Sequence, residues 1–304
     1  MASNKTGVLN IDKPSGLTSH DVVARVRRLT GIRRVGHAGT LDPLATGVLL
    51  VCVGPATRIA EYLQRGRKVY EVTVRLGQET DTYDADGEVV AESPVPDFSL
   101  AEIQRALDAF RGDITQTPPA YSAIKRHGQP LYKLARAGVA VDVPRRQVTI
   151  DAIEILEWRN PELRLRITCS PGTYIRSIAY DLGRALGVGG HVQRLRRVAS
   201  GSWRVEDAVT LTTLEAAGAD WPRYLHGLRG ALSMLPSVVL PADLAYRFVL
   251  GQRVSLDAQP PVATDLRVLG PGEKFLGIGR IKAGVLAPLK VFADPQKVAG
   301  GIDR

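Results

Sequence analysis

The segment Gly36–Leu49, GHAGTLDPLATGVL, constrains the fold more than any other part of the chain. It places one carboxylate, Asp42, in a short Thr-Leu-Asp-Pro loop, and the apolar run VLLVCV follows. Pro43 has a fixed φ and favours an extended conformation of Asp42, while Gly36 and Gly39 permit a sharp turn or a close backbone approach. The pattern predicts a single acid presented at the start of a buried strand. An Asp-Pro loop alone is most often an ordinary turn, so its meaning depends on the other segments.

Basic residues gather in three segments that carry almost no acids. The chain of 304 residues has a formal net charge of +9, and the clusters lie between Val22 and Leu41, between Tyr121 and Ile150, and between Leu182 and Val205. The first and the last of these segments each hold five arginines and no acid. Such clusters suit a polyanion such as nucleic acid, and solvated faces are the alternative interpretation.

The cysteines and the apolar runs indicate the compartment. Cys52 and Cys169 each lie in or at the end of an apolar run, which favours buried thiols over disulfide partners or metal ligands, and no zinc spacing is present. The N-terminal residues include no apolar targeting segment, and VLLVCV is too short to span a bilayer. We therefore expect a cytoplasmic protein without membrane association.

Periodicity predicts helices and strands around one core. A helix is expected over TSHDVVARVRRLTG, capped by Thr18 or Ser19 and ended by Gly31. KVYEVTVRLG alternates as a strand that places Tyr70 on the core side, and ELRLRITCS alternates as another. The acidic stretch ETDTYDADGEV fails the EF-hand ligand pattern, so it is interpreted as a polar hairpin loop.

Two later regions differ from this pattern. The basic, aromatic segment PPAYSAIKRHGQPLYKLARAGVAVDVPRR has weak periodicity and is either a mobile arm or an ordinary surface insertion. After about Leu235 the sequence changes to short strands around Gly-rich turns. This change predicts a small, mainly β unit of roughly 70 residues that packs on the main domain.

A second chemical signal lies in PGTYIRSIAYDLG. Arg176 falls in the first turn of the expected helix, where the helix dipole disfavours a cation by a few tenths of a kcal/mol. An arginine at such a place is expected to have a partner, either a carboxylate or a phosphate. An arginine–carboxylate pair would hold an aspartate ionised and lower its pKa by roughly 1–3 units. Tyr174 stands two residues earlier.

These segments together resemble a known family. KPSGLTSHDVV, GHAGTLDPLATGVL, KVYEV with RLGQETDTYDADG, YSAIK with GQPLYKLARAG, and CSPGTYIRSIAYDLG with LRR occur in the order seen in TruB-type tRNA pseudouridine synthases. The resemblance covers roughly residues 7–205. The C-terminal unit resembles a PUA domain in position and strand content, with a looser match.

The resemblance implies a fold and an activity. The fold is α+β, with a mixed, largely antiparallel sheet flanked by helices in a catalytic domain over residues 1–234, a thumb inserted at about 121–150, and a PUA-like RNA-binding domain over 235–304. The activity converts uridine 55 in the T-loop of tRNA to pseudouridine by base flipping, C1′–N1 cleavage, rotation of the base and C1′–C5 bond formation. No metal or organic cofactor is implied. The implied partner is the tRNA T-arm, bound by a monomer that requires no other protein.

The resemblance also assigns roles to residues. The catalytic aspartate falls on Asp42, and the tyrosine that stacks on the base falls on Tyr70. A second active-site tyrosine, the arginine that pairs with the aspartate, a leucine that closes the pocket and a supporting lysine fall on Tyr174, Arg176, Leu195 and Lys13. The histidine that enters the space left by flipped nucleotides falls on His37. We expect further RNA contacts from basic residues, namely Arg33, Arg34, Lys125, Arg126, Arg136, Arg194, Arg196 and Arg197.

The chemistry of these residues leaves alternatives open. An ionised carboxylate near the ribose can attack C1′ or remove the C2′ proton through a glycal, and the sequence does not choose between them. The Tyr70 hydroxyl as acceptor of the C5 proton is a further hypothesis. A guide-RNA-dependent relative of the dyskerin type, a non-catalytic RNA-folding protein and a nucleoside hydrolase are the competing functions. The last normally needs more acids around the ribose than one.

Overall fold

The computed structural model describes residues 5–119, 121, 125–126, 129–130, 143–256 and 265–299. Its largest unit is an eleven-stranded sheet made of β1 (Gly7–Lys13), β2 (Val35–His37), β3 (Thr46–Val53), β4 (Lys68–Leu76), β7 (Gly112–Gln116), β10 (Arg146–Arg159), β11 (Glu162–Cys169), β12 (Gly190–Ser200), β13 (Trp203–Arg204), β14 (Val209–Thr210) and β15 (Leu225–His226). The main order is β14-β1-β3-β12-β4-β11-β10-β7. Only the β1–β14 and β3–β12 pairs are parallel in the described sheet, so the mixed, largely antiparallel sheet expected from the sequence is confirmed.

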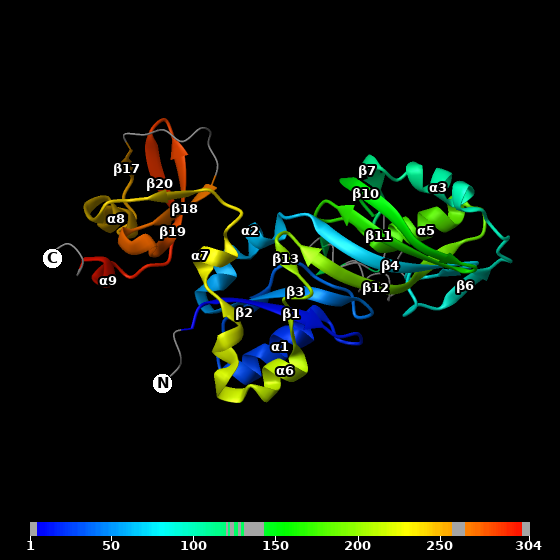
Figure 1. The fold of residues 1–304 in the computed structure, drawn as a ribbon, viewed down its shortest axis with the longest axis horizontal. Helices are drawn as coiled ribbons and strands as arrows, with labels where there is room; N and C mark the ends of the chain where they lie inside the picture. The colour runs from blue at the N-terminus through cyan, green and yellow to red at the C-terminus, as the bar shows by residue number, and fades with distance from the viewer. Residues whose placement is uncertain are drawn as a thin grey trace.

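Helices cover one face of this sheet and bury apolar side chains against it. They are α1 (Ser19–Thr30), α3 (Leu100–Asp108), α5 (Ile175–Ala185), α6 (Leu211–Ala216) and the 3-10 helix η2 (Gly218–Tyr224). Val22 of α1, Ile103 of α3 and Leu182 of α5 are completely buried in one core cluster with Val72 of β4. Figure 1 shows α3 and α5 near β10 and β11, with α1 and α6 below β1.

Shorter helices cover the other side of β1 and β3. These are η1 (Gly54–Ile59), α2 (Ala60–Gln64) and α7 (Leu228–Ala231). Val8 of β1, Leu50 of β3 and Ile59 of η1 form a second core cluster, to which Ile278 from the C-terminal sheet also belongs. This shared cluster joins the two sheets of the chain.

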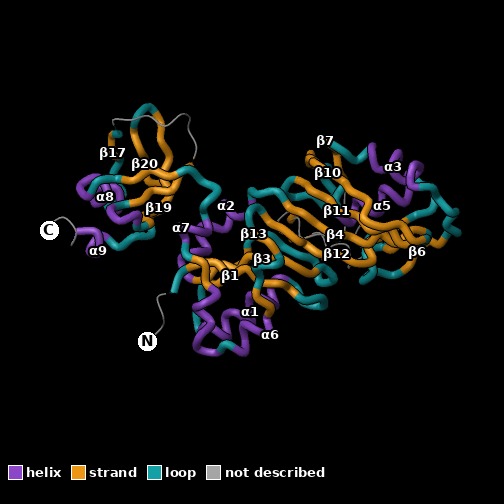
Figure 2. Tube along the Cα trace, viewed as in Figure 1, coloured by secondary structure: helices purple, strands orange, loops and turns teal. Residues whose placement is uncertain are grey.

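The C-terminal part forms a five-stranded sheet with its own core. Its elements are β16 (Ser237–Val239), β17 (Val254–Ser255), β18 (Asp265–Leu269), β19 (Phe275–Lys282), β20 (Val285–Val291), α8 (Ala242–Val249), α9 (Pro295–Ala299) and η3 (Pro271–Glu273). The strand order is β16-β18-β19-β20-β17, and Phe248 and Val268 lie in its core. Arg58 Nη1 donates to Val291 O at 2.8 Å, and Lys290 contacts Glu61, which fastens β20 to η1 and α2. Figure 2 shows this unit at one end of the molecule.

Local sequence signals agree with the structure around the first helix. Thr18 and Asp21 form a capping box at the start of α1, and Gly31 ends it with a φ of +67°. In β4, Tyr70, Val72 and the later alternate residues are buried as expected. The predicted helix and strand are therefore confirmed, because each was specified by residues close together in the sequence.

One feature differs from the expectations. Residues 146–150, expected at the end of the inserted thumb, form the start of β10 and pair with β7. Leu195 lies in the middle of β12. The ETDTYDADGEV segment forms the predicted hairpin, which runs from β5 (Gln78–Thr80) to β6 (Val89–Glu92). Within the insertion, β8 (Lys125–Arg126) pairs with β9 (Gln129–Pro130).

The helices in the described part of the chain are all too short or too polar to cross a lipid bilayer.

Candidate active site

The Asp42 loop lies between β2 and β3 and is fixed by contacts from β1 and α1. Lys13 Nζ and the Gly16 amide both donate to Pro43 O, at 3.1 and 2.9 Å. Ser19 Oγ accepts from Leu41 N at 2.9 Å and lies 3.1 Å from Leu41 O. The residues on both sides of Asp42 are therefore held by the KPSG turn and the first helical turn that precede the loop in the sequence.

Lys13 supports this loop through hydrogen bonds to its backbone and to the preceding turn. Its side chain is completely buried, and Nζ donates to Pro14 O, Leu17 O and Pro43 O at 2.9, 2.6 and 3.1 Å. An ammonium has three N–H donors, so these carbonyls use all of them. Desolvation lowers the pKa of Lys13 to about 8. The geometry suits the supporting role that the family resemblance implies.

Arg176 brings a distant part of the chain to Asp42. It lies in the first turn of α5, its Nε is 3.0 Å from Asp42 Oδ2, and its Nη2 donates to Oδ1 at 3.1 Å. The guanidinium also donates to Thr82 O at 3.0 Å and to Tyr121 O at 3.1 Å. The side chain of Arg176 is only 6% exposed. This two-point contact fixes the orientation of the carboxylate.

Asp84 is a site residue that sequence reasoning missed. Its Oδ2 lies 3.2 Å from Arg176 Nη1, and Thr82 Oγ1 donates to its Oδ1 at 2.6 Å. Asp84 is 4% exposed, whereas Asp81 and Asp86 of the same hairpin are exposed. The hairpin segment belongs to the motifs that carry the family resemblance, but the spacing of its acids does not show which one is buried. Only the position of Arg176 identifies Asp84.

A cavity of about 250 Å³ opens beside this cluster. Tyr70 and Leu195 form apolar parts of its wall and are 8% and 7% exposed. Asp42 and Arg176 lie on its border, so the cavity offers an aromatic side chain next to a carboxylate. The lining residues are Gly39, Thr40, Leu41, Asp42, Gln64, Lys68, Tyr70, Pro171, Gly172, Thr173, Tyr174, Ile175, Arg176, Leu195 and Arg197.

Burial and charge act in opposite directions on the acid. Desolvation raises the pKa of Asp42 above its ordinary value, while the guanidinium of Arg176 opposes this rise. The expected lowering of the pKa by the Arg176 pair is present, but desolvation of the carboxylate in the pocket outweighs it. Desolvation also raises the pKa of Tyr70, which keeps its hydroxyl neutral near pH 7.

The basic residues expected to bind RNA do not form one surface. Arg197 is 2% exposed and donates to Gly39 O, Thr40 O and Val48 O, so its guanidinium supports the backbone of the site. Its burial means that Arg197 is not an exposed phosphate contact, although it lines the pocket of Asp42. Arg136 lies outside the described residues, and Lys125 and Arg126 form β8. Arg33 and Arg34 are exposed.

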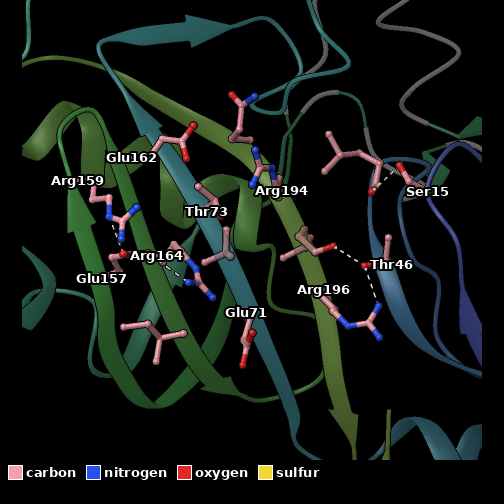
Figure 3. Close-up of a pocket in the computed structure, with 15 residues that line it drawn as sticks. Ser15, Thr46, Glu71, Thr73, Glu157, Arg159, Glu162, Arg164, Arg194 and Arg196 are labelled. Atoms are coloured by element: carbon pink, nitrogen blue, oxygen red, sulfur yellow. Dashed lines mark hydrogen bonds and ion pairs between the residues drawn. The ribbon is translucent and has the colours of Figure 1, made fainter. Parts of the chain in front are cut away.

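Arg194 and Arg196 line a different cavity. Strand alternation places them with Glu71 and Thr73, on the face of the sheet opposite to Tyr70. The cavity there has a volume of about 680 Å³, and Glu71, Glu157 and Glu162 line it together with Arg194. Figure 3 shows these acids, and Arg196 beside Thr46. Arg196 Nη1 and Nη2 also pair with Asp12 at 3.0 and 2.8 Å. The two arginines therefore do not point into the pocket of Asp42.

His37 lies in β2 and is half-buried. Its ring meets the ring of His20 edge to face, with centroids 5.9 Å apart. Desolvation, and then the proximity of His20, lowers its pKa. Its Nδ1 is buried and has no hydrogen-bond partner among the described residues. The lowered pKa favours the neutral form of this imidazole.

Comparison with known proteins agrees with this geometry. Residues 27–175 match the family model described as TruB family pseudouridylate synthase (N terminal domain). Residues 176–246 match the tRNA pseudouridylate synthase B C-terminal domain, and residues 236–292 match Pseudouridine synthase II TruB, C-terminal. The tRNA pseudouridine synthase B of Gloeobacter violaceus is 48% identical over 94% of this chain and 98% of its own length. The tRNA pseudouridine synthase B of Sodalis glossinidius is 42% identical over 95% of this chain and 96% of its own length.

Solved structures show the same fold. The matched chain in an H/ACA RNP bound to a substrate RNA containing 2′-deoxyuridine has a TM-score of 0.74 and 25% identity, over 95% of this chain and 86% of that one. The matched chain of a Cbf5-Nop10-Gar1 complex has a TM-score of 0.74 and 27% identity, over 96% of this chain and 86% of that one. The fold and the relatives define a pseudouridine synthase, an isomerase. More narrowly, the chain belongs to the TruB family.

Proposed function

We propose that this enzyme isomerises uridine 55 in the T-loop of tRNA to pseudouridine, with Asp42 as the catalytic residue. The observation that carries the proposal is the Asp42–Arg176 ion pair beside a pocket walled by Tyr70. The relatives named tRNA pseudouridine synthase B, which match over nearly their whole length, support tRNA as the substrate. The pocket of about 250 Å³ is the place for one extruded nucleotide.

The carboxylate of Asp42 is the group that reacts with the ribose. It either attacks C1′ while the C1′–N1 electron pair leaves with the uracil, or removes the C2′ proton as that bond breaks. The uracil then rotates and C5 bonds to C1′; in the first route the bond between Asp42 and C1′ breaks at this step, and in the second the carboxyl of Asp42 returns its proton to C2′ of the glycal. C5 finally loses its proton while N1 gains one, so no atom is lost overall. Arg176 holds the carboxylate towards the pocket through two contacts and favours its ionised form.

Tyr70 and Leu195 receive the base. Stacking of a base on an aromatic side chain stabilises binding by about 1–3 kcal/mol, which offsets part of the cost of extruding the nucleotide. Because the pKa of Tyr70 is raised, its hydroxyl is a poor acceptor for the C5 proton, and a hydrogen-bonding role suits it better. Tyr174 lines the same pocket at the start of α5. His37 occupies the space opened by flipped nucleotides.

The T-arm is bound by shape and by phosphate contacts. Arg33 and Arg34 are exposed just before β2, which makes them candidates for phosphate contacts. The division into a catalytic domain over residues 1–234 and a PUA-like RNA-binding domain over 235–304 remains part of this proposal. The separate core of the C-terminal sheet supports that division.

The enzyme acts alone, as a monomer in the cytoplasm, under this proposal. The solved structures with the same fold include complexes with other proteins and RNA, so a guide-RNA-dependent enzyme is the competitor. Incubation of the purified protein with an unmodified tRNA transcript separates the two. Carbodiimide mapping should locate pseudouridine at position 55 without any added protein or guide RNA.

The catalytic assignment is tested by Asp42→Asn in the same assay. We expect no pseudouridine and near wild-type tRNA affinity, because the substitution removes the reactive carboxylate and keeps its size. Conversion near the wild-type rate would remove Asp42 from the mechanism. Absence of pseudouridine with the wild-type protein would refute the proposed activity itself.

A further inference from the structure

The two ends of the inserted segment meet the active-site helix at one place. Gln116 is the last residue of β7 and Arg146 is the first of β10, and they are direct partners in the antiparallel ladder. Residues 117–145 run between them. Figure 1 shows β7 and β10 side by side at the edge of the sheet, close to α5. Both partners turn their side chains to the Gly172–Tyr174 turn that precedes α5.

Gln116 binds the backbone of Tyr174 with both ends of its amide. Tyr174 N donates to Gln116 Oε1 at 2.7 Å, and Gln116 Nε2 donates to Tyr174 O at 2.9 Å. Tyr174 is the N-cap residue of α5 and makes no capping hydrogen bond through its own side chain. Gln116 is 2% exposed, so water does not compete for these bonds. An amide from another strand therefore fixes the start of the helix.

Arg146 holds the same turn from the neighbouring strand. Its Nη1 donates to Gly172 O at 3.2 Å, and its guanidinium carbon lies 5.1 Å from the centre of the Tyr174 ring. Gly172 has a φ of +85°, a conformation that glycine adopts readily and L-residues rarely do, so the turn depends on a glycine at this position. The aromatic ring that borders the pocket is thus oriented by a cation at the base of the insertion.

Two more contacts join the same region to the catalytic pair. Ser177 Oγ donates to Thr117 O at 2.8 Å, and Arg176 Nη2 donates to Tyr121 O at 3.1 Å. The first helical turn is therefore fixed at residues 174, 176 and 177 by the chain that leaves β7. Arg176 sits between these contacts and Asp42.

We propose that Gln116 and Arg146 are positioning residues for the isomerisation, which set Tyr174 and Arg176 in register with Asp42. This inference rests on the proposed function and extends it to residues outside the pocket. Neither residue touches the reacting atoms; each acts through the turn at 172–174. A displacement of this turn moves the guanidinium away from the two-point contact that orients the carboxylate, and errors of about 1 Å in such groups can cost about 100-fold in rate.

The test compares Gln116→Met with Gln147→Met on the full-length protein. Methionine matches glutamine in length, but its side chain cannot replace the hydrogen bonds to Tyr174 N and Tyr174 O. Gln147 is the exposed neighbour in β10 whose amide bonds Thr115, so its variant is the matched control. We expect Gln116→Met to lower the single-turnover rate at saturating enzyme by roughly 10- to 100-fold, with tRNA affinity within about twofold of wild type. Gln147→Met should retain the wild-type rate.

A double-mutant cycle distinguishes positioning from general destabilisation. If Gln116 acts through Arg176, Gln116→Met should cost much less in an Arg176→Lys background than in wild type. Arg146→Lys keeps the charge but loses the planar guanidinium, so it should retain more rate than Arg146→Ala. Thermal melting would reveal whether Gln116→Met unfolds, and the comparison of Arg146→Lys with Arg146→Ala applies even then.

The outcomes separate the two proposals. Equal rates for Gln116→Met and wild type would overturn the positioning role and leave the proposed function intact. Full additivity with Arg176→Lys, or equal losses for Arg146→Lys and Arg146→Ala, would also overturn it. A wild-type protein inactive on tRNA would instead refute the proposed function.

Discussion

Asp84 contacts the one guanidinium nitrogen of Arg176 that Asp42 does not. Asp84 Oδ2 lies 3.2 Å from Nη1, while Asp42 binds Nε and Nη2. One buried cation is therefore shared by two carboxylates, one of which borders the pocket and one of which is almost completely buried. Such an arrangement fixes the arginine from behind and leaves Asp42 as the acid presented to a ligand.

Asp84→Asn should reduce both stability and rate. Removing one partner from a buried ion pair commonly costs about 3–5 kcal/mol of stability. The loss here should lie towards the lower value, because an asparagine can still accept from Thr82 Oγ1 and Arg176 still donates to Thr82 O. We expect a lower unfolding temperature and a single-turnover rate reduced by roughly tenfold or more. Thermal melting and a rapid-quench assay measure the two effects. Glu88→Gln, an exposed change in the same hairpin, is the control, and equal behaviour of the two variants would contradict the role of Asp84.

The pH profile should report the ionisation of Asp42. Its carboxylate form is required, and burial raises its pKa, so the rate should fall as pH decreases through a value above that of an ordinary aspartate. Arg176 lowers this pKa, and its loss should move the acidic limb to higher pH. Arg176→Met should therefore shift the limb upward, while Arg176→Lys, which keeps the positive charge, should shift it less. Single-turnover rates from about pH 4 to pH 8 would show this, and coincident limbs would remove Asp42 as the titrating group.

Lys13→Met should loosen the Asp42 loop. The substitution leaves the carbonyls of Pro14, Leu17 and Pro43 without their shared donor. An unsatisfied buried polar group costs about 1–3 kcal/mol, partly offset because the buried ammonium is itself penalised by desolvation. We expect a clear decrease in unfolding temperature together with a reduced rate and nearly unchanged tRNA affinity. A variant with wild-type stability and rate would show that the loop is held by Gly16 and Ser19 alone.

The site was predictable where it depends on neighbouring residues and unpredictable where it depends on distant contacts. The turn, helix cap and Asp-Pro loop around Asp42 are specified within the first part of the chain, and Arg176 was recognisable as a cation in an unfavourable helical position. Asp84 was not, because a run of similar acids does not show which one faces a buried arginine.

Contacts between distant segments explain the other differences. Residues 146–150 of β10 pair with β7, and residues 146–150 alone do not reveal this pairing. In β12, three nearby arginines look equivalent in a charge count, yet Arg194 and Arg196 share one face of the sheet while Arg197 is buried on the other. The clustering of basic residues therefore does not predict which arginine is buried or which face of the sheet each one occupies.

The salt dependence of tRNA binding should distinguish these arginines. Each phosphate contact that is lost reduces the slope of log K against log salt by about 0.7–0.9. Arg33→Ala combined with Arg34→Ala should lower the slope by up to two such steps, because both side chains are exposed. Arg194→Ala should leave it unchanged, since Arg194 lies on the opposite face of the sheet from the pocket. Filter binding between about 50 and 200 mM salt gives the slopes. A reduced slope for Arg194→Ala alone would place the T-arm on the face shown in Figure 3 instead.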